Sequence, residues 1–407
     1  MRQSLARVLP LFLALLPALS CVSRVERAAG ELDRTLDSLK AIHAPDTRVA
    51  VWNAVVTYHK GVLRLEGEVD QGEAYRAIQE AVKRMFPGTV FELRLLPGEG
   101  SRGLVNGLVK NSVINLRAKP GHRSELVTQA LLGMPVRILK EEEGWYLVQL
   151  PNRYLGWVER SVIRPLDEAG LERYREMDKI VFTRQCGQAH ECPDRESRPV
   201  SDLVAGCILP VLSAGTDFYE VIYPDSTVGW VERVEAARVA EFFPGALSGE
   251  RLVEMAMAYR GIPYLWGGTS TKGVDCSGLT FMVCFMNGTI LDRDASQQCL
   301  HGSVITTEYR PDNLLPGDLL FFGRKATGAH PERVSHVAIY AGDGEFIHAS
   351  ENLGRVGISS MDSAGTGYIP GYGDLFIRAV RVAGERGPGL QPLSENPFFN
   401  EIIRFAP

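Results

Sequence analysis

A cysteine at the start of an apolar segment is the most reactive feature of this sequence. Cys276 lies in Asp-Cys-Ser-Gly, directly before a run of apolar residues that predicts a helix through Met286. Unpaired N–H groups and the positive end of the dipole at a helix start stabilise a thiolate, and can lower a thiol pKa from about 8.5 to roughly 3.5–7.5. The same N–H groups can receive an oxyanion. Cys276 is therefore a candidate nucleophile, although a buried structural cysteine is the commoner case.

Two histidines are placed to act on such a thiol. His336 and His348 each lie in an apolar segment that predicts a strand, and the turn at 342–344, Gly-Asp-Gly, separates the two segments. Antiparallel pairing about this turn would bring the two rings together across a hairpin. One imidazole would then serve as the base for Cys276, and the other would fix its tautomer, as the third member of a catalytic triad does.

The elements that position these residues belong to a chain of several domains. Its 407 residues are 45% hydrophobic and 23% charged, with a formal net charge of −5. This length predicts two to four domains, and the apolar fraction is ordinary for packed cores. The chain has no block of Lys and Arg, which argues against a nucleic-acid partner. We expect a monomer that does not bind nucleic acid.

The first residues are typical of an export signal. Arg2 and Arg7 precede an uncharged apolar run at 8–19, which is too short to cross about 30 Å of hydrocarbon as a helix. Small residues then lead into Cys21, in a pattern that resembles a bacterial lipoprotein signal. We expect a signal peptide at 1–20, a lipid anchor on Cys21, and a location in the periplasm or cell envelope. An ordinary cleaved signal with a coincidental cysteine is the alternative.

An internal repeat follows the N-terminal segments. The pentapeptide Gly-Trp-Val-Glu-Arg at 156–160 recurs at 229–233, with matching residues before it. Short β-branched and aromatic strands between turns predict a small barrel in each copy, and both copies resemble bacterial SH3-like domains of cell-wall proteins. For the extra cysteines of the second copy, Cys186, Cys192 and Cys207, a disulfide between the first two or inert thiols is favoured over a zinc site.

Four motifs of the C-terminal part resemble the NlpC family of papain-like cell-wall cysteine peptidases, in order and over residues 248–383. They are Pro-Tyr-Leu-Trp-Gly-Gly at 263–268, Asp-Cys-Ser-Gly at 275–278, Leu-Leu-Pro-Gly-Asp-Leu-Leu-Phe-Phe at 314–322, and the histidine-bearing segment at 335–349. The resemblance implies that Cys276 is the nucleophile, His336 the general base and His348 the orienting residue. It also places Tyr264 beside the oxyanion site, and it implies no metal or other cofactor. Trp266 is expected to serve in packing.

The predicted fold class is therefore multidomain, with a small α+β N-terminal unit, two SH3-like β-barrels and a C-terminal α+β papain-like domain. The expected segments are a signal peptide at 1–20, a lipidated N-terminus and helical spacer at 21–47, a small α+β domain at 48–98, barrels at 105–170 and 175–240, the papain-like domain at 247–385, and a C-terminal extension at 386–407.

Two barrels before such a peptidase resemble the γ-D-glutamyl-L-diamino-acid endopeptidases, which cleave peptidoglycan stem peptides between D-Glu and diaminopimelate. Relatives that require a free N-terminal L-Ala hold its ammonium between a carboxylate of the peptidase and groups of the first barrel. Asp294, Glu125 and Tyr154 match those positions, although Ala295 stands where some relatives have serine. A solvated surface charge for Glu125 and barrel packing for Tyr154 are equally favoured alternatives. The other expected substrate contacts are Arg293, Asp275, Ser277 and Ser296.

The leading hypothesis is an endopeptidase for stem peptides with free L-Ala, acting in recycling or trimming. The first alternative is a lysin of the same bond specificity that accepts intact peptidoglycan. The second is an inactive wall-binding lipoprotein, which the filled catalytic positions argue against.

Overall fold

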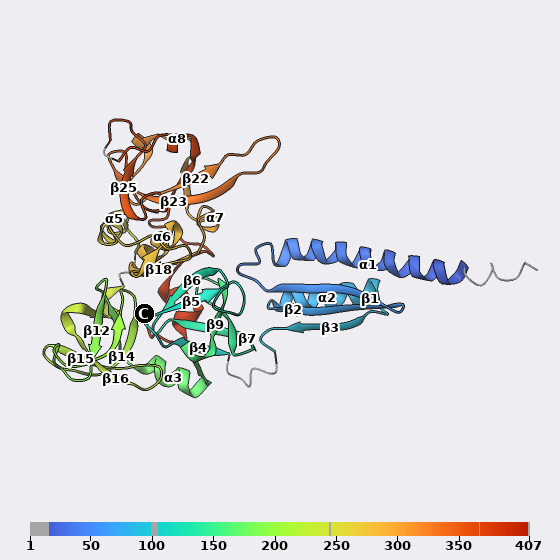
Figure 1. Ribbon diagram of the computed structural model, residues 1–407, viewed down its shortest axis with the longest axis horizontal. Coiled ribbons are helices and arrows are strands. Elements are labelled where there is room, and N and C mark those ends of the chain that lie inside the picture. The colour runs from blue at the N-terminus through green and yellow to red at the C-terminus, as the bar shows by residue number, and fades with distance from the viewer. Residues whose placement is uncertain (1–15, 99–104, 244–245, 366, 406–407) are drawn as a thin grey trace, which may run out of the picture. The chain divides into compact units, whose positions relative to one another are not determined.

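The computed structural model describes residues 16–98, 105–243, 246–365 and 367–405, and it divides into two compact units, Met1–Gly100 and Ser101–Pro407 (Figure 1). The predicted signal peptide falls mostly on residues 1–15, which lie outside the described residues. Within the described residues, no helix has the length and apolar character needed to span a membrane.

The N-terminal unit is a three-stranded sheet with two helices on one face. Strand β1 (Trp52–His59) pairs antiparallel with β2 (Val62–Val69), and β2 pairs parallel with β3 (Val90–Leu95). The covering helices are α1 (Leu16–His43) and α2 (Gly72–Met85). Leu32 and Leu36 of α1 are buried against Leu65 and Ile78 of the sheet and α2. The predicted α+β unit is confirmed, and α1 is part of its core rather than a separate spacer.

The repeat forms two barrels with the same strand connectivity. The first barrel has the order β10-β4-β7-β8-β9-β5-β6, and the second has the order β13-β12-β16-β15-β14-β11-β17, which is the same topology read from the other end. The strands of the first barrel are β4 (Asn106–Val109), β5 (Val113–Arg117), β6 (Leu126–Leu131), β7 (Pro135–Glu142), β8 (Trp145–Gln149), β9 (Leu155–Glu159) and β10 (Ile163–Leu166). Those of the second are β11 (Lys179–Phe182), β12 (Gly187–His190), β13 (Pro199–Leu203), β14 (Ile208–Ala214), β15 (Phe218–Ile222), β16 (Val228–Glu232) and β17 (Ala236–Arg238). The helix α3 (Glu168–Glu176) connects the barrels.

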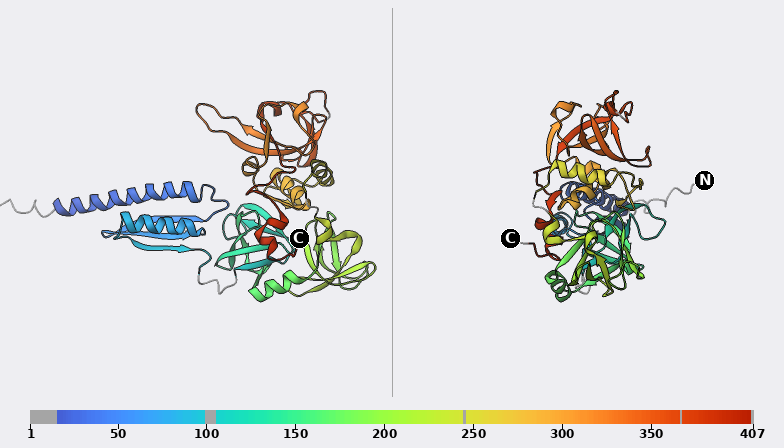
Figure 2. Two further views of the ribbon diagram at one scale, coloured as in Figure 1. Left: turned by 180° about the vertical axis from the view of Figure 1, so that it is seen from behind. Right: turned by 90° about the vertical axis from the view of Figure 1, so that its left-hand side faces the viewer.

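The C-terminal domain places helices against an antiparallel sheet, as predicted (Figure 2). Its six strands run in the order β21 (Ser303–Thr306), β26 (Phe376–Arg381), β22 (Leu319–Arg324), β23 (Arg333–Gly342), β24 (Glu345–Ser350) and β25 (Arg355–Ser360). The packed helices include α5 (Gly249–Ala258), α6 (Cys276–Met286), α7 (Ala295–Gln298) and α8 (Tyr372–Leu375). Every residue of α6 is buried, which explains why its sequence is mostly apolar.

The predicted C-terminal extension is integrated into this unit. Strand β27 (Leu390–Pro392) pairs with β20 (Thr289–Leu291), and α9 (Pro397–Asn400) follows. The amide of the buried Asn396 donates to the carbonyl of Pro151 in the first barrel, at 3.0 Å. The end of the chain therefore ties the C-terminal domain to the barrel.

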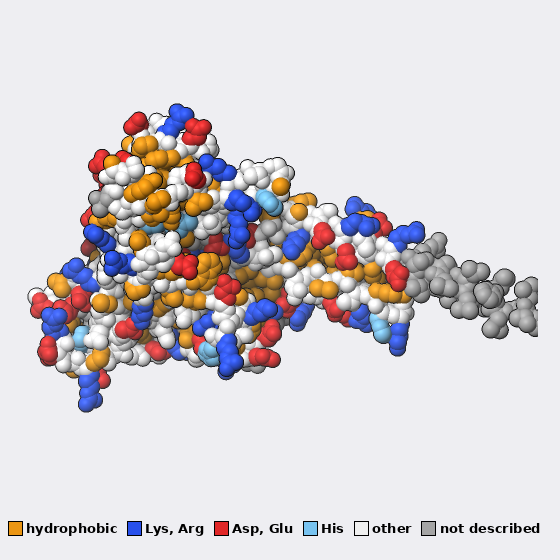
Figure 3. Space-filling model, turned by 45° about the horizontal axis from the view of Figure 1, so that its top comes forward, with side chains coloured by type: hydrophobic (Ala, Val, Ile, Leu, Met, Phe, Trp, Pro, Cys, Tyr) orange, Lys and Arg blue, Asp and Glu red, His pale blue; other side chains and the backbone are white. Residues whose placement is uncertain are grey.

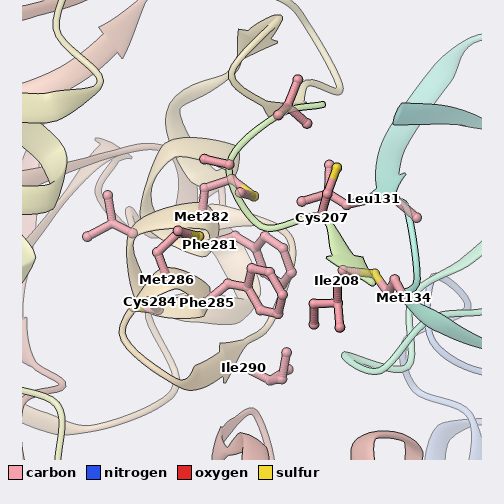
Figure 4. Packing of buried hydrophobic residues seen from close by; sticks show 14 of the residues in the cluster. Leu131, Met134, Cys207, Ile208, Phe281, Met282, Cys284, Phe285, Met286 and Ile290 are labelled. Atoms are coloured by element: carbon pink, nitrogen blue, oxygen red, sulfur yellow. The ribbon is translucent and has the colours of Figure 1, made fainter. Parts of the chain in front are cut away.

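One hydrophobic core joins both barrels to α6. Leu131 and Met134 of the first barrel and Cys207 and Ile208 of the second lie beside Phe285 of the helix (Figure 4). Gly206, at φ +93°, has no room for a side chain, because an added Cβ would lie 2.8 Å from Leu131 and 2.9 Å from Phe285. The barrels are thus fixed in place against the helix that begins with the candidate nucleophile.

The cysteines of the second barrel do not form the predicted disulfide. Cys186 and Cys192 are exposed free thiols, and Cys207 is a buried free thiol. The extended strand β12 lies between the first two. The structure therefore agrees with the alternative of free thiols rather than with a disulfide.

Candidate active site

Cys276 is the first residue of α6, at the place where the sequence predicted a nucleophile. Asp275 caps the helix, and its carboxylate accepts a hydrogen bond from the backbone N–H of Gly278 at 2.7 Å. The thiol is 9% exposed, and the backbone N–H of Val337 on β23 hydrogen-bonds its sulfur. Because Val337 directly follows His336, this contact places the sulfur beside the segment of β23 that carries the predicted base.

The two histidines meet across the hairpin as expected. Nε2 of His336 lies 2.8 Å from Nδ1 of His348, with the rings nearly perpendicular. His336 therefore uses its Nε2 toward the second ring, and its Nδ1 is the nitrogen left for a proton from Cys276. His348 is fully buried, and its Nε2 lies 3.1 Å from the hydroxyl of Ser359 on β25. This chain of contacts fixes the orientation of His336.

Tyr372 of α8 completes the wall around the imidazoles. Its ring lies about 6 Å from each histidine ring, at 6.1 Å from His336 and 6.0 Å from His348. It also interacts electrostatically with Cys276, so the thiol and both rings share one neighbour. Neither Ser359 nor Tyr372 carried a signal in the sequence, because their contacts depend on how distant segments return to the hairpin.

Burial sets the protonation state of the site. Burial, and secondarily the Asp275 carboxylate, raises the pKa of the Cys276 thiol to about 12. Burial also lowers the pKa of His336 to about 4 and that of His348 to about 3. The thiol and both rings are therefore neutral at rest. This differs from the thiolate that we expected, because burial raises the thiol pKa more than the helix N-terminus lowers it. A neutral His336 is the form that can accept the thiol proton.

Arg293 lies beneath the nucleophile rather than in an open groove. Its guanidinium is 1% exposed and binds the Asp275 carboxylate through two hydrogen bonds, of 3.0 and 2.6 Å. It also donates to the hydroxyl of Ser277 at 2.9 Å and to Thr128 of the first barrel at 3.0 Å. The structure thus differs from the predicted substrate contacts at Arg293, Asp275 and Ser277, because these buried groups bind one another.

Tyr154 and Glu125, expected to contact substrate, bond to residues of the C-terminal domain, with Tyr154 buried and Glu125 exposed. The hydroxyl of Tyr154 donates to Asp294 at 3.0 Å, and the indole N–H of Trp266 donates to Glu125 at 2.9 Å. Trp266 is 63% exposed, so it serves at this surface rather than in the core packing that was predicted. Two side-chain hydrogen bonds to carboxylates therefore link the first barrel to the C-terminal domain.

The remaining candidates lie nearby. Asp294 caps α7, and Ser296 is the second residue of that helix, half-buried. Tyr264 is half-buried and interacts electrostatically with Cys276. Burial, followed by the nearby Cys276, raises the pKa of its phenol, so its hydroxyl remains a hydrogen-bond donor.

Both the C-terminal domain and the first barrel match known protein families. Residues 261–368 match the NlpC/P60 family, and residues 116–163 match the bacterial dipeptidyl-peptidase Sh3 domain. The chain is 31% identical over 265 residues to a protein named dipeptidyl-peptidase 6 from Lysinibacillus sphaericus, covering 63% of this chain and 92% of that protein. It is 27% identical over 262 residues to a γ-D-glutamyl-L-lysine dipeptidyl-peptidase from Bacillus cereus, covering 61% of this chain and 74% of the relative.

A solved structure shares the fold. The crystal structure of an NlpC/P60 family protein from Bacillus cereus superposes with a TM-score of 0.58 at 23% identity, covering 68% of this chain and 99% of the other. The alignment covers more of this chain than the C-terminal domain alone contains.

Proposed function

The chain belongs to the NlpC/P60 family of peptidases, and from this premise we propose that it is a cysteine endopeptidase acting on peptidoglycan stem peptides. The bond cleaved is that between the γ-carboxyl of D-Glu and diaminopimelate. The proposal is supported by Cys276 at a helix start, by its contact with the residue that follows His336, and by the close approach of His336 to His348. The names of the relatives support a γ-D-glutamyl bond as the target.

The reaction proceeds through a thioester. His336 Nδ1 takes the proton of Cys276 as the sulfur attacks the γ-carbonyl of D-Glu, so that thiolate and imidazolium form together and stabilise each other. The imidazolium then protonates the leaving amine of diaminopimelate, and the C–N bond breaks. A water molecule, deprotonated by His336, hydrolyses the thioester and restores the thiol. His348 accepts from His336 Nε2–H throughout and supports the imidazolium.

Two donors support the charge that develops on the carbonyl oxygen. The backbone N–H of Cys276 lies at the start of α6, where it has no partner within the helix. The Tyr264 hydroxyl, held in its protonated form by burial, is the second donor. Donors fixed in a dry site in this way contribute strongly, because they require no reorganisation during the reaction.

The carboxylates of Asp294 and Glu125 are proposed to hold the free ammonium of an N-terminal L-Ala. Tyr154 and Trp266 donate hydrogen bonds to these carboxylates, which restricts their orientation. A glycan-linked stem peptide has no such ammonium, so it would lack this attraction to the two carboxylates. The proposed substrates are therefore short stem peptides that are already free of glycan.

Neutralising either carboxylate should weaken use of the free-ammonium substrate. For Asp294→Asn and Glu125→Gln, we expect kcat/KM on L-Ala-γ-D-Glu-diaminopimelate to fall by about 10- to 100-fold, the value of a charge-assisted contact. Turnover of the N-acetylated tripeptide should be low and unchanged by either variant. Steady-state kinetics, with the released products separated by chromatography, measures kcat/KM on both peptides. Glu172→Gln on the exposed helix α3 is the control, and equal losses on both substrates would contradict the role.

Ser359 is proposed as a positioning residue for His348. Its hydroxyl accepts from the Nε2–H of His348, which leaves the Nδ1 lone pair for His336. In Ser359→Ala we expect kcat to fall roughly 2- to 10-fold with KM unchanged. The acidic limb of the kcat/KM profile should move to lower pH, because the less supported imidazolium loses its proton more readily. Ser359→Thr should restore both, and a variant with an unaltered pH profile would rule out this role.

We also infer that the chain is exported and held to a membrane by a lipid on Cys21. The support is the sequence of residues 1–21 alone. Labelling with a radioactive fatty acid in cells should mark the wild type and not Cys21→Ser. Equal labelling of the two proteins would show that Cys21 does not carry the lipid anchor.

A further inference from the structure

A groove of about 710 Å³ opens beside His336, and its charged side chains have no part in the mechanism above. It is lined by Arg324 and Lys325 at the end of β22, by Arg333 at the start of β23, and by Asp374 of α8. Tyr372 forms part of its wall next to the imidazole. The groove is thus continuous with the catalytic histidine and carries three cations and one carboxylate.

Arg324 and Arg333 are direct partners in the antiparallel pairing of β22 with β23. Like charges in that position destabilise a sheet, so the fold gains nothing from this pair. Both side chains are exposed, and neither arginine forms a salt bridge with a carboxylate among the described residues. Arg324 donates to the backbone carbonyl of Pro331 at 3.5 Å, and Lys325 interacts electrostatically with Glu308. Two arginines that face each other without a counter-ion are an arrangement that a bound anion would stabilise.

The groove and the carboxylates proposed to hold the L-Ala ammonium are built from different elements. Asp294 and Glu125 are bonded where the first barrel meets the C-terminal domain, whereas residues of β22, β23 and α8 line the groove. Figure 3 shows basic side chains beside a hydrophobic surface on the C-terminal domain. A peptide with its N-terminus at the barrel would pass Cys276 and place its leaving portion in this groove.

We propose that the basic groove binds the carboxylates of the leaving diaminopimelate residue and selects it over lysine. This inference rests on the proposed function. Diaminopimelate at the end of a tripeptide presents two carboxylates and one ammonium, which match the three cations and Asp374. Lysine lacks the side-chain carboxylate, so it offers the three cations one carboxylate instead of two. The arginines are therefore specificity-determining residues that do not take part in the chemical step.

Three substrates separate this inference from the proposed function. They are L-Ala-γ-D-Glu-meso-diaminopimelate, the corresponding L-Lys tripeptide, and L-Ala-γ-D-Glu γ-p-nitroanilide, whose leaving group carries no carboxylate. The wild type should prefer the diaminopimelate peptide to the lysine peptide by at least about 10-fold in kcat/KM. For Arg324→Gln and Arg333→Gln, kcat/KM on the diaminopimelate peptide should fall roughly 10-fold, mainly through KM.

The anilide and a distant arginine variant serve as controls for the groove. Anilide turnover should be the same in the wild type, in both arginine variants, and in Arg198→Gln, which removes an exposed charge from the second barrel. If the anilide and both peptides are cleaved but the arginine variants leave the preference for diaminopimelate unchanged, the groove proposal is wrong and the proposed function stands. An equal loss on all three substrates would also overturn it. If the wild type cleaves none of them, the proposed function itself fails.

Discussion

Replacing Cys276 with alanine is expected to abolish turnover of L-Ala-γ-D-Glu-diaminopimelate, by about four orders of magnitude or more. The thioester cannot form without the sulfur, and the neighbouring groups cannot substitute for it. Alanine fits the site, because the thiol is 9% exposed and its loss removes one heavy atom from the start of α6. Product release by chromatography measures the loss, and circular dichroism checks the fold.

Cys284 provides the matched control. It lies on the same helix, is 1% exposed and contacts no catalytic group described above. Cys284→Ala should therefore keep kcat near that of the wild type, although burial makes some loss of stability expected. A Cys276→Ala protein with more than a few per cent of wild-type activity would contradict the thiol mechanism. Equal losses in the two variants would assign the effect to the helix rather than to the nucleophile.

Replacing Arg293 with methionine is expected to give the largest loss of stability among single substitutions around the site. The change leaves the buried Asp275 carboxylate, 6% exposed, without its cation. Loss of one partner from such a pair costs about 3–5 kcal/mol of unfolding free energy. Chemical denaturation at pH 7 measures this, and activity should fall as well, because Asp275 caps the helix that presents Cys276.

A double variant tests whether the unpaired Asp275 carboxylate causes the loss of stability. Asp275→Asn combined with Arg293→Met removes both charges, so it should recover part of the lost stability. Arg310→Met, which disrupts an exposed pair with Glu308, should leave the unfolding free energy nearly unchanged. A single Arg293→Met variant that loses less than about 1 kcal/mol would show that the buried pair is not needed to hold the helix start.

Local patterns predicted the parts of the site that lie close together in the sequence. Cys276 is marked by the apolar helix after it, and the histidines are marked by two apolar strands around a glycine turn. The barrels were predictable because one pattern occurs twice, and the shared topology confirms the repeat. Each of these signals is repeated or periodic, so no knowledge of tertiary packing is needed to read it.

Contacts between distant segments could not be predicted in the same way. Arg293 was expected to face substrate, but its partners Asp275 and Thr128 come from a helix start and from the first barrel. Ser359 reaches His348 only because β25 pairs with β24. The pKa of Cys276 was expected to be lowered by its position in the helix, but burial under the sheet raises it. These outcomes depend on packing, which leaves no fixed spacing in the sequence.

The arginine pair of the groove shows the same limit. Arg324 and Arg333 look like ordinary surface charges in the sequence, since they are separated by a loop without a recognisable motif. Only the register of β22 against β23 places them directly opposite each other. The sequence leaves open which diamino acid is preferred. The evidence for diaminopimelate comes from the pairing of the two strands.

The most direct test of the proposed function compares free stem peptide with intact peptidoglycan. Purified protein is incubated with L-Ala-γ-D-Glu-diaminopimelate and, in parallel, with intact sacculi that offer the same amount of stem peptide, and the products are identified by mass spectrometry. The account predicts L-Ala-γ-D-Glu and free diaminopimelate from the tripeptide and almost no fragments from sacculi. Release from sacculi at a comparable rate would contradict the role of Asp294 and Glu125 and identify a lysin, and no cleavage of either substrate would contradict the peptidase assignment.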